Sequence, residues 1–596
     1  MTMNKMTKVS TAVDPITLQV IRGSLETIAE EMGHVLYRMS FSSIIRESQD
    51  LGAGLFDVDF NTLCESESTP MHIGSIPGYL RGIAETLEDG EWYEGDVVVH
   101  NHPYHGASHT PDLAIVVPVF FRGRLVGFAG NTAHHVDIGA ATPGLIIDVP
   151  DVYAEGMLFA GTKLYRKGEP NNAMWNYIRR NSRAAGQLVA DIEAQIASAR
   201  LGARRFAELL DKYGEETVFA AANQLMDYAE RMIRQRIGEI PDGDYVAEGW
   251  LDDDGRNRDR RLKVKVTVRV RGDEVEVDLT GSADQTPTAY NVPFEGSTKV
   301  AAYAGFRKLL LDAATSEVRV PSNEGSFRPI KVTAPLGSIF NPRPPASAEA
   351  RFTQCNRMID LIIRALAPVM PEQVIAGSSA SISFAAYSGV RPSGDYWVFL
   401  EVNEGAYGGR PRSDGPDSID NLMANTRNNP LEDLAMHIPM ICDRYELRDD
   451  APPGAGEFRG GIGVVKAQRV LTPAFITHES ERHTEAPWGI FGGQDGAVGR
   501  CTITNPNRPG ETREMHSKFS GLAVGPDDVM TYYSPNGGGY GDPLNRPAAK
   551  VLEDVLDGYC SVARAREVYG VVVDPEAETV DLAATEKLRL AMQKHD

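Results

Sequence analysis

The sequence predicts a multi-domain α+β protein: an N-terminal metal-binding α/β region with long helices, followed by β-rich, Gly- and Pro-rich C-terminal domains. Three observations support this fold class. Apolar residues recur at helical spacing over long stretches of the first 240 residues, alternating strands follow, and glycine-rich stretches crowd the last part of the chain. At 596 residues the chain is long enough for several domains, which we place at 1–240, 241–350 and 351–596.

The first predicted helix begins after Asp14. This aspartate can cap a helix whose first residue is Pro15. Apolar residues then recur three and four positions apart, at Ile21, Leu25, Ile28, Met32, Val35 and Met39. The spacing predicts a core helix that ends near Ser40. An irregular polar segment follows and ends at Asp50.

A β-hairpin is predicted at 113–133. Two apolar runs rich in β-branched residues flank Arg122-Gly123-Arg124, which reads as the turn. If the turn centres on Gly123, the numbers of paired residues sum to 246. Asp112 then lies opposite His134, and His109 lies opposite Asp137. A bulge would slip the register by one residue and exchange His134 for His135.

The remaining elements are predicted from the same periodicities. A helical region covers 174–238 and gives way to strands at 262–270 and 274–279. One further helix is predicted at 351–366. After it, repeated Gly and Pro favour turns and short strands over long helices.

Composition excludes several classes of function. The formal net charge of −22 argues against nonspecific binding to nucleic acid or anionic membranes, which requires clustered positive charge. The five cysteines form no CxxC pair, so a disulfide framework or a thiolate metal site is not expected. No apolar run reaches the roughly 18–20 residues of a membrane helix. The N-terminus lacks the apolar core of a signal peptide, and we expect a cytoplasmic protein.

A histidine–carboxylate cluster is the strongest functional signal. Of the 13 histidines, five lie in one short stretch: His102, His105, His109, His134 and His135. Together with Asp112 and Asp137 they offer the ligand types that hold Zn²⁺, Mn²⁺ or Fe²⁺, and the commonest general acids and bases. Ordinary hydrogen-bonded Asp–His pairs are the metal-free alternative. For the set as a whole we favour a metal or catalytic site.

A fourth ligand is expected from elsewhere in the chain. Asp50 is the best candidate, because it ends an irregular polar loop just before a strand. His72 is a second candidate, although we expect it to line the site as a polar side chain rather than to bind the metal. His135 should point to the opposite face of the hairpin, since successive strand residues alternate.

Other chemistry is sparse. The sequence contains neither a Gly-x-x-x-x-Gly-Lys-Ser/Thr phosphate loop nor a Gly-x-Ser-x-Gly elbow. The glycine runs at 460–463 and 537–539 are read as turns. None of the cysteines has a neighbouring base in sequence, so none is assigned as a nucleophile.

At the histidine cluster the sequence resembles the hydantoinase B family. The likeness lies in three motifs, Asn101-His102-Pro103-Tyr104-His105-Gly106, His109-Thr110-Pro111-Asp112 and Ala133-His134-His135-Val136-Asp137-Ile138-Gly139. It continues along nearly the whole chain, for example in 323–329, 456–463 and 537–543. One departure is His102, which stands where the family usually has aspartate.

The resemblance implies a two-component, ATP-dependent enzyme. An A-type partner chain would bind ATP and Mg²⁺ and phosphorylate the carbonyl oxygen of a cyclic amide. The B-type chain would carry one divalent metal, Zn or Mn or else Fe, where water opens the ring. Absence of a phosphate loop here agrees with ATP binding on the partner. A hetero-tetramer or larger assembly is expected, with no nucleic-acid or membrane partner.

The family's ligand positions carry over to His109, Asp112 and His134, with Asp50 as the fourth ligand. His135, Asp137 or His105 would then relay protons or orient the ligands. Two alternatives to a lactamase or hydantoinase stay open: a component of an acetone- or acetophenone-type ketone carboxylase, and a non-catalytic structural component.

Overall fold

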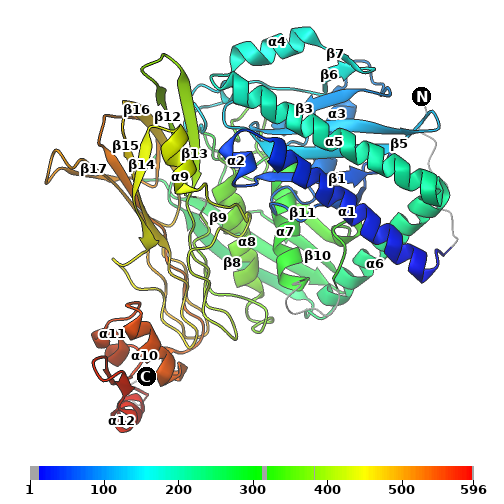
Figure 1. Cartoon of the computed structure of the whole chain (residues 1–596). Coiled ribbons are helices and arrows are strands. Elements are labelled where there is room, and N and C mark those ends of the chain that lie inside the picture. The colour runs from blue at the N-terminus through cyan, green and yellow to red at the C-terminus, as the bar shows by residue number, and fades with distance from the viewer. Residues whose placement is uncertain (1–11, 312–318, 382, 594–596) are drawn as a thin grey trace.

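A seven-stranded antiparallel sheet forms the N-terminal part of the protein. The computed structural model describes residues 12–311, 319–381 and 383–593 (Figure 1). The strand order in this sheet is β2-β1-β5-β4-β3-β6-β7. Its strands are β1 Leu51–Phe56, β2 Thr62–Glu65, β3 Val97–His100, β4 Asp112–Phe121, β5 Arg124–His134, β6 Thr162–Arg166 and β7 Glu169–Pro170.

Helices cover both faces of this sheet. On one face lie the long helices α1 (Pro15–Met39), α5 (Ala185–Tyr213) and α6 (Glu215–Ile237), which share a buried apolar cluster with β1, β4 and β5. On the other face α3 (Ile76–Thr86) packs against Val116 and Phe128. The short helices α2 (Ser43–Arg46) and α4 (Asn172–Asn181) complete this part.

The predicted first helix is confirmed at both ends. The Asp14 carboxylate accepts hydrogen bonds from the backbone N–H groups of Ile16 and Thr17, and the helix ends at Met39, with Ser40 as its C-cap. Ile21, Leu25, Ile28 and Met32 are buried as the spacing predicts. Each such side chain contributes about 1.5–3 kcal/mol of burial energy.

The hairpin register is confirmed, although the turn differs from the expected one. Asp112 pairs with His134 and every pair down to Val119–Gly127 sums to 246. The turn has two central residues, Arg122 and Gly123, both with positive φ (50° and 76°), which is the twist that two-residue hairpin turns prefer. That turn alone would give a sum of 245. A bulge at the unpaired residue between Leu125 and Gly127 restores 246.

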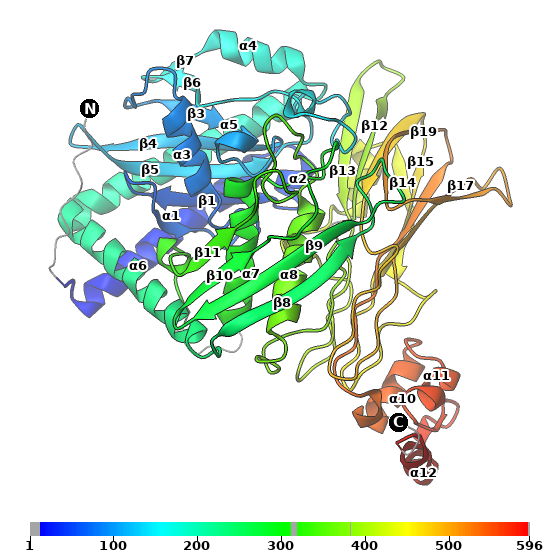
Figure 2. The ribbon, with the colours of Figure 1, turned by 180° about the vertical axis from the view of Figure 1, so that it is seen from behind.

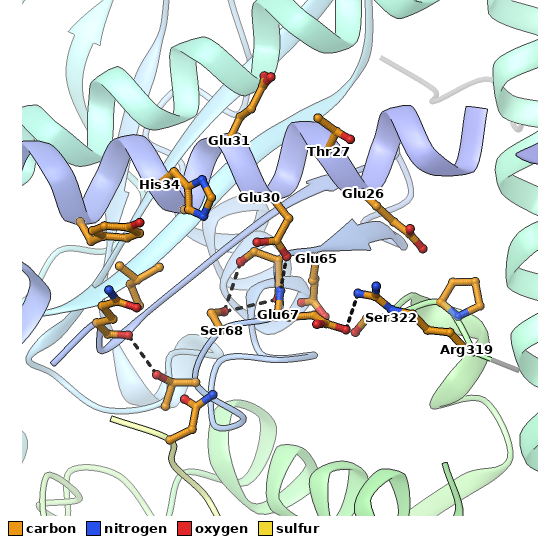
Figure 3. A pocket seen from close by; sticks show the side chains of 18 of the residues that line it. Glu26, Thr27, Glu30, Glu31, His34, Glu65, Glu67, Ser68, Arg319 and Ser322 are labelled. Atoms are coloured by element: carbon orange, nitrogen blue, oxygen red, sulfur yellow. Dashed lines mark hydrogen bonds and ion pairs between the residues drawn. The ribbon is translucent and has the colours of Figure 1, made fainter. Parts of the chain in front are cut away.

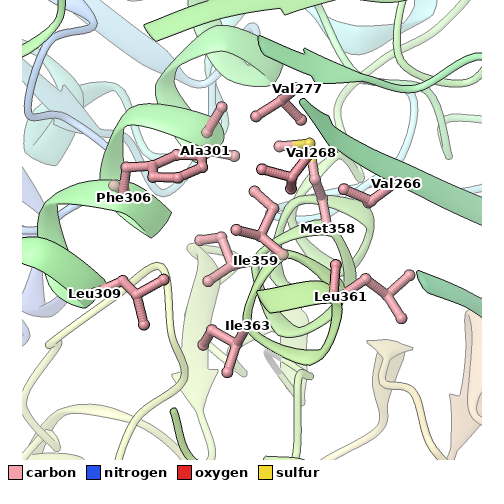
Figure 4. Packing of buried hydrophobic residues seen from close by; sticks show 14 of the residues in the cluster. Val266, Val268, Val277, Ala301, Phe306, Leu309, Met358, Ile359, Leu361 and Ile363 are labelled. Atoms are coloured by element: carbon pink, nitrogen blue, oxygen red, sulfur yellow. The ribbon is translucent and has the colours of Figure 1, made fainter. Parts of the chain in front are cut away.

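A second sheet has order β11-β10-β9-β8 and is seen best in Figure 2. Its strands are β8 Gly243–Leu251, β9 Leu262–Arg271, β10 Glu274–Asp278 and β11 Ile330–Thr333. The helices α7 (Lys299–Leu310) and α8 (Phe352–Leu366) pack on one face of it. Figure 4 shows Val266, Val268 and Val277 of the strands meeting Phe306 of α7 and Met358 of α8. The helix predicted at 351–366 is thus confirmed.

The next part is a β-sandwich. A four-stranded sheet, β13-β12-β16-β19, shares an apolar core with a five-stranded sheet, β14-β15-β20-β17-β18. The strands are β12 Phe384–Val390, β13 Tyr396–Val402, β14 Met440–Leu447, β15 Val464–Val470, β16 Ala474–Glu479, β17 Arg500–Thr504, β18 Thr512–Met515, β19 Lys518–Val524 and β20 Val529–Tyr533. Helix α9 (Leu431–His437) precedes β14. The alternation of short strands and turns matches the Gly- and Pro-rich sequence.

A small helical unit ends the described chain and lies below the sandwich in the view of Figure 1. It consists of α10 (Ala548–Leu556), α11 (Val562–Glu567) and α12 (Leu582–Met592), with the two-stranded ladder β21 (Val573–Asp574) and β22 (Thr579–Val580). These helices, like α3 and α7, are not predicted from the sequence. Among the residues that the structure describes, none of the helices combines the length and apolar character that crossing a bilayer requires.

The α+β class is therefore confirmed. The helical region gives way to β8 at Gly243, close to the expected boundary at 240. Division into three domains stays a prediction, because apolar clusters join residues from different parts of the chain. One cluster brings Leu51 and Ala133 of the first sheet together with Phe384 and Leu400 of the sandwich.

Candidate metal centre

Three side chains converge where β4 begins and β5 ends. Asp112 is the first residue of β4, His134 is the last of β5, and His109 lies in the loop before β4. One ligand atom from each lies within 4.8 Å of the other two, the one such group among the described residues. All three side chains are buried. The hairpin register, together with three residues of loop, therefore assembles a cluster of two imidazoles and a carboxylate.

The two oxygens of the Asp112 carboxylate have different neighbours. Its Oδ2 accepts hydrogen bonds from the Ser108 hydroxyl (2.5 Å) and from the Arg351 guanidinium (3.0 Å). Its Oδ1 faces the two imidazoles: it lies 2.9 Å from His109 Nε2 and is hydrogen-bonded to His134 Nδ1 at 3.1 Å. Burial raises the pKa of Asp112, but the neighbouring imidazoles outweigh it and hold the pKa well below its usual range. Asp112 is therefore a carboxylate with one oxygen directed at the cluster.

His109 presents a lone pair to the same point. Its Nδ1 lies 3.0 Å from the backbone carbonyl oxygen of Glu349, which can only accept, so Nδ1 carries the proton. Burial and the nearby Arg351 lower the pKa of His109 to about 4, so the ring is neutral at pH 7. Nε2 is then an unprotonated nitrogen beside a carboxylate oxygen, and it makes no hydrogen bond within the described structure.

The donor set suits a divalent cation. Two lone pairs facing each other across 2.9 Å repel unless a positive charge lies between them. Donor atoms that are each about 2.1 Å from one Zn²⁺ ion lie roughly 3–3.5 Å apart, close to the spacings found here. The Nε2 atom of His134 is likewise buried and unpartnered among the described atoms. Hydrogen bonds that fix His109 and Asp112 from behind are the usual support of metal ligands.

A small cavity adjoins this cluster. Its volume is about 40 Å³, enough for a few water molecules. Residues from the first sheet, the start of α8 and the sandwich line it, together with their loops: Asp50, Met71, His109, His134, Leu145, Glu349, Arg351, Phe352, Phe384, Val402, Ala424, Thr426 and Glu479. The cavity is thus closed by the packing of the sandwich against the first sheet.

Asp50 lies at this cavity but is bound to a histidine. Its Oδ1 lies 3.1 Å from His72 Nε2, and His72 Nδ1 lies 2.9 Å from the hydroxyl of Thr132. The two candidates for a fourth ligand therefore form a pair. Asp50 is not one of the three residues whose ligand atoms converge, although its backbone carbonyl accepts a hydrogen bond from the His134 N–H.

The three residues expected to relay protons lie outside the cavity. His135 points to the other face of the hairpin, as predicted, where its Nε2 lies 2.9 Å from the amide oxygen of Gln195 in α5. The ladder ends before His109 and Asp137 could pair, and Asp137 instead binds Arg183 and Ser182. His105 is about two-fifths exposed and lies 3.3 Å from Glu85.

Sequence reasoning missed three charged residues of the cavity, Glu349, Arg351 and Glu479. Glu349 and Arg351 lie two residues apart just before α8, and both side chains line the cavity. Two charged residues at this spacing could have been recognised as a pair facing one side. Glu479 ends β16, hundreds of residues from the cluster along the chain. Nothing in its local sequence indicates a site.

A larger groove lies near the small cavity (Figure 3). Its lining includes Gln49, Leu51 and Arg427, which are neighbours in sequence of the cavity residues Asp50 and Thr426. The groove has a volume of about 780 Å³. Its walls include Glu26 and Glu30 of α1, Glu67 in the loop after β2, and Arg319 in the segment 319–322. Its side chains are partly paired with one another, as in the ion pair between Arg319 and Glu67. It lacks the converging imidazoles, so its greater size does not make it the better candidate for the chemistry.

The sequence profile of the Hydantoinase B/oxoprolinase family matches residues 14–543. The chain belongs to this family. Among curated relatives it is 45 % identical over 589 residues to a chain of Pseudomonas sp. (strain NS671) named as the B component of a D-/L-hydantoinase, covering 97 % of this chain and 98 % of that one. It is 32 % identical over 598 residues to the beta chain of caprolactamase from Pseudomonas jessenii, covering 97 % and 99 %.

Two solved structures share this fold. The crystal structure of ATP-dependent caprolactamase from Pseudomonas jessenii superimposes with a TM-score of 0.88 at 29 % identity, over 97 % of this chain and all of that chain. The nucleotide-free structure of acetone carboxylase superimposes with a TM-score of 0.87 at 18 % identity, over 98 % of this chain and 83 % of that chain. At that identity the second likeness concerns the fold alone.

Proposed function

We propose that this protein is the metal-dependent B-type component of an ATP-dependent cyclic amide hydrolase. In this proposal an A-type partner chain phosphorylates the carbonyl oxygen of a lactam, hydantoin or 5-oxoproline-like ring. The B-type chain then holds the activated ring while water opens it. The relatives named as the B component of a hydantoinase and the beta chain of caprolactamase support both the reaction class and the need for a partner.

One observation carries the proposal: the convergence of His109, Asp112 and His134 in a buried cavity. Hydrolysis of an amide at neutral pH needs a strong nucleophile and stabilisation of developing negative charge. A divalent metal bound by these three residues would supply both, because it lowers the pKa of bound water and acts as a Lewis acid.

The chain's own residues prepare this site. The Glu349 carbonyl keeps the proton of His109 on Nδ1, which leaves Nε2 free to bind. Ser108 and Arg351 hold Oδ2 of Asp112 and so aim Oδ1 at the cluster. The walls around Phe384 exclude bulk water, which strengthens every electrostatic interaction inside. A cyclic amide is larger than the 40 Å³ cavity, so the lining segments must separate when it binds.

Turnover by the assembled complex tests the proposal. The chain is co-expressed with an A-type partner, supplied with ATP and a divalent metal, and assayed with caprolactam, 5-oxoproline and hydantoins, with and without bicarbonate. We expect ring opening that depends on ATP, needs no bicarbonate, and is lost when Asp112→Asn removes a ligand charge.

Two results would contradict it. ATP use that requires bicarbonate and a ketone, with none for any cyclic amide, would make the chain a carboxylase component. Full ring-opening activity in the Asp112→Asn variant would assign the cluster a structural role.

A further inference from the structure

Glu479 is a buried carboxylate without a fixed role in the fold. It ends β16 at the rim of the sandwich, next to Phe384 of β12 and Lys518 of β19. Its side chain is almost completely buried and lines the same cavity as His109 and His134. Its Oε2 makes no hydrogen bond to any described atom. An unpaired buried carboxylate oxygen is costly, and such groups gather at functional sites.

The cationic side chains near Glu479 form their ion pairs with other carboxylates. Lys518 pairs with Glu481, and Arg351 binds Asp112. Glu481, Glu349 and the phenol of Tyr290 also lie close to Glu479, and hydrogen bonding by Tyr290 lowers the pKa of Glu479 against the larger effect of burial. Glu479 is therefore free to exchange a proton with a molecule in the cavity. Burial raises the pKa of Glu479 to about 7, near the pH at which a proton-transfer group works best.

Position distinguishes Glu479 from a similar glutamate nearby. Glu404, just after β13, is also buried, also has an Oε2 without a partner among the described atoms, and has its pKa raised to about 7 by burial. Glu404 does not line the metal-ligand cavity, and its other oxygen accepts a hydrogen bond from Tyr445. The two residues thus share their electrostatics and differ in access to the candidate site.

We infer that Glu479 transfers the proton that ring opening requires, moving it from the attacking water to the departing ring nitrogen. This inference rests on the proposed function. As the water oxygen bonds to the activated carbonyl carbon, one O–H bond breaks and its proton passes to the Glu479 carboxylate. As the C–N bond breaks, its electron pair stays on nitrogen, which takes the proton from Glu479. The carboxylate of Glu479 is regenerated. The remaining O–H proton of the attacking water is lost to solvent as the carbonyl re-forms, so the opened ring leaves this step as an acyl phosphate. A second water then cleaves the acyl phosphate to a carboxylate and inorganic phosphate.

The test compares three variants in the complete complex with its A-type partner. Glu479→Gln keeps the size and hydrogen bonding of the side chain but cannot carry the proton. Glu479→Asp keeps the acid and withdraws it by one methylene. Glu404→Gln is the matched control, a buried glutamate changed in the same way outside the cavity. The readouts are metal per chain, KM for the ring, single-turnover ADP formation, and the rate of ring-opened product.

We expect Glu479→Gln to lower kcat for ring opening by about 10²-fold or more, while metal content, KM and the ADP burst stay at wild-type values. Glu479→Asp should be intermediate, and Glu404→Gln should stay within about threefold of wild type. A purely structural role would not separate product formation from the ADP burst.

Two results overturn this inference while leaving the proposed function standing. One is a Glu479→Gln complex that opens the ring within about threefold of the wild-type rate. The other is loss of bound metal together with activity, which would make Glu479 a ligand or a support of the ligands. A wild-type complex that opens no ring overturns the proposed function and this inference with it.

Discussion

Nε2 of His109 lies 2.9 Å from Oδ1 of Asp112, and neither atom carries a proton at neutral pH. The proton of His109 is on Nδ1, where the Glu349 carbonyl accepts it, and the pKa of Asp112 is well below its usual range. The two lone pairs repel each other in the metal-free protein. A bound cation replaces this repulsion with two attractive contacts, and this relationship underlies the predictions that follow.

Divalent metal should stabilise the fold. A ligand that binds only the folded state at 100 times its Kd adds about 2.7 kcal/mol to the free energy of unfolding. We expect Zn²⁺ or Mn²⁺ to raise the melting temperature of chelator-treated protein, as followed by calorimetry. The Asp112→Asn variant should show no such rise, and an equal rise in that variant would place the metal elsewhere.

The two histidines of the first motifs should differ in their effect on turnover. His109→Ala should lower ring opening by about 10²-fold or more, because it removes one of the three converging ligand atoms. His105→Ala, only four residues away but outside the cavity, is the control and should retain near wild-type activity. Both rates are measured in the assembled complex. Equal losses in the two variants would disagree with the geometry.

Arg351 should matter more to the metal-free protein than to the metal-loaded one. Arg351→Met leaves the buried Asp112 carboxylate without its cation, and breaking a buried pair costs about 3–5 kcal/mol. Bound metal offers the carboxylate another positive charge and should recover part of that cost. Thermal melts with and without metal measure the difference. Arg364→Met, an exposed residue of α8, is the control and should change the melting temperature equally with and without metal.

Glu65 should make stability depend on pH. Burial raises the pKa of this carboxyl from 4.5 to about 8, so between these values the folded chain binds a proton that the unfolded chain does not. Stability from this group is therefore present at low pH and is lost as pH rises through about 8.

Glu65→Gln cannot ionise, but its amide oxygen can still accept a hydrogen bond from the Gly74 N–H. The quantity to compare is the melting temperature of the variant minus that of wild type. This difference should be at least about 2 °C larger at pH 8.5 than at pH 5.5. An unchanged difference between the two pH values would count against the raised pKa. Glu67→Gln, two residues further along the chain and exposed, is the control.

Local patterns predicted the elements that build the cluster. The helical spacing after Asp14 and the two apolar runs of the hairpin are short-range signals, and both are confirmed. The register was predicted correctly from a turn that differs in detail. The two-residue turn at Arg122 and Gly123 lowers the pairing sum to 245, and the one bulge residue raises it again to 246. Sequence alone does not reveal that these two effects cancel.

The rest of the site depends on packing between distant segments. Arg351 reaches Asp112 across 239 residues of chain, and Glu479 arrives on a strand of the sandwich. Such contacts are fixed by how sheets and helices pack, which no local periodicity encodes. The same holds for Asp137, which the pairing rule set opposite His109 but which follows the end of the ladder and binds Arg183 instead.

Elemental analysis of the purified chain, paired with ring-opening assays of its complex, tests the central claim most directly. We expect about one divalent ion per wild-type chain, near zero in Asp112→Asn, and ring-opening activity that follows the metal content across both proteins. Wild-type protein that opens the ring at full rate without bound metal, or Asp112→Asn protein that keeps both, would contradict the account.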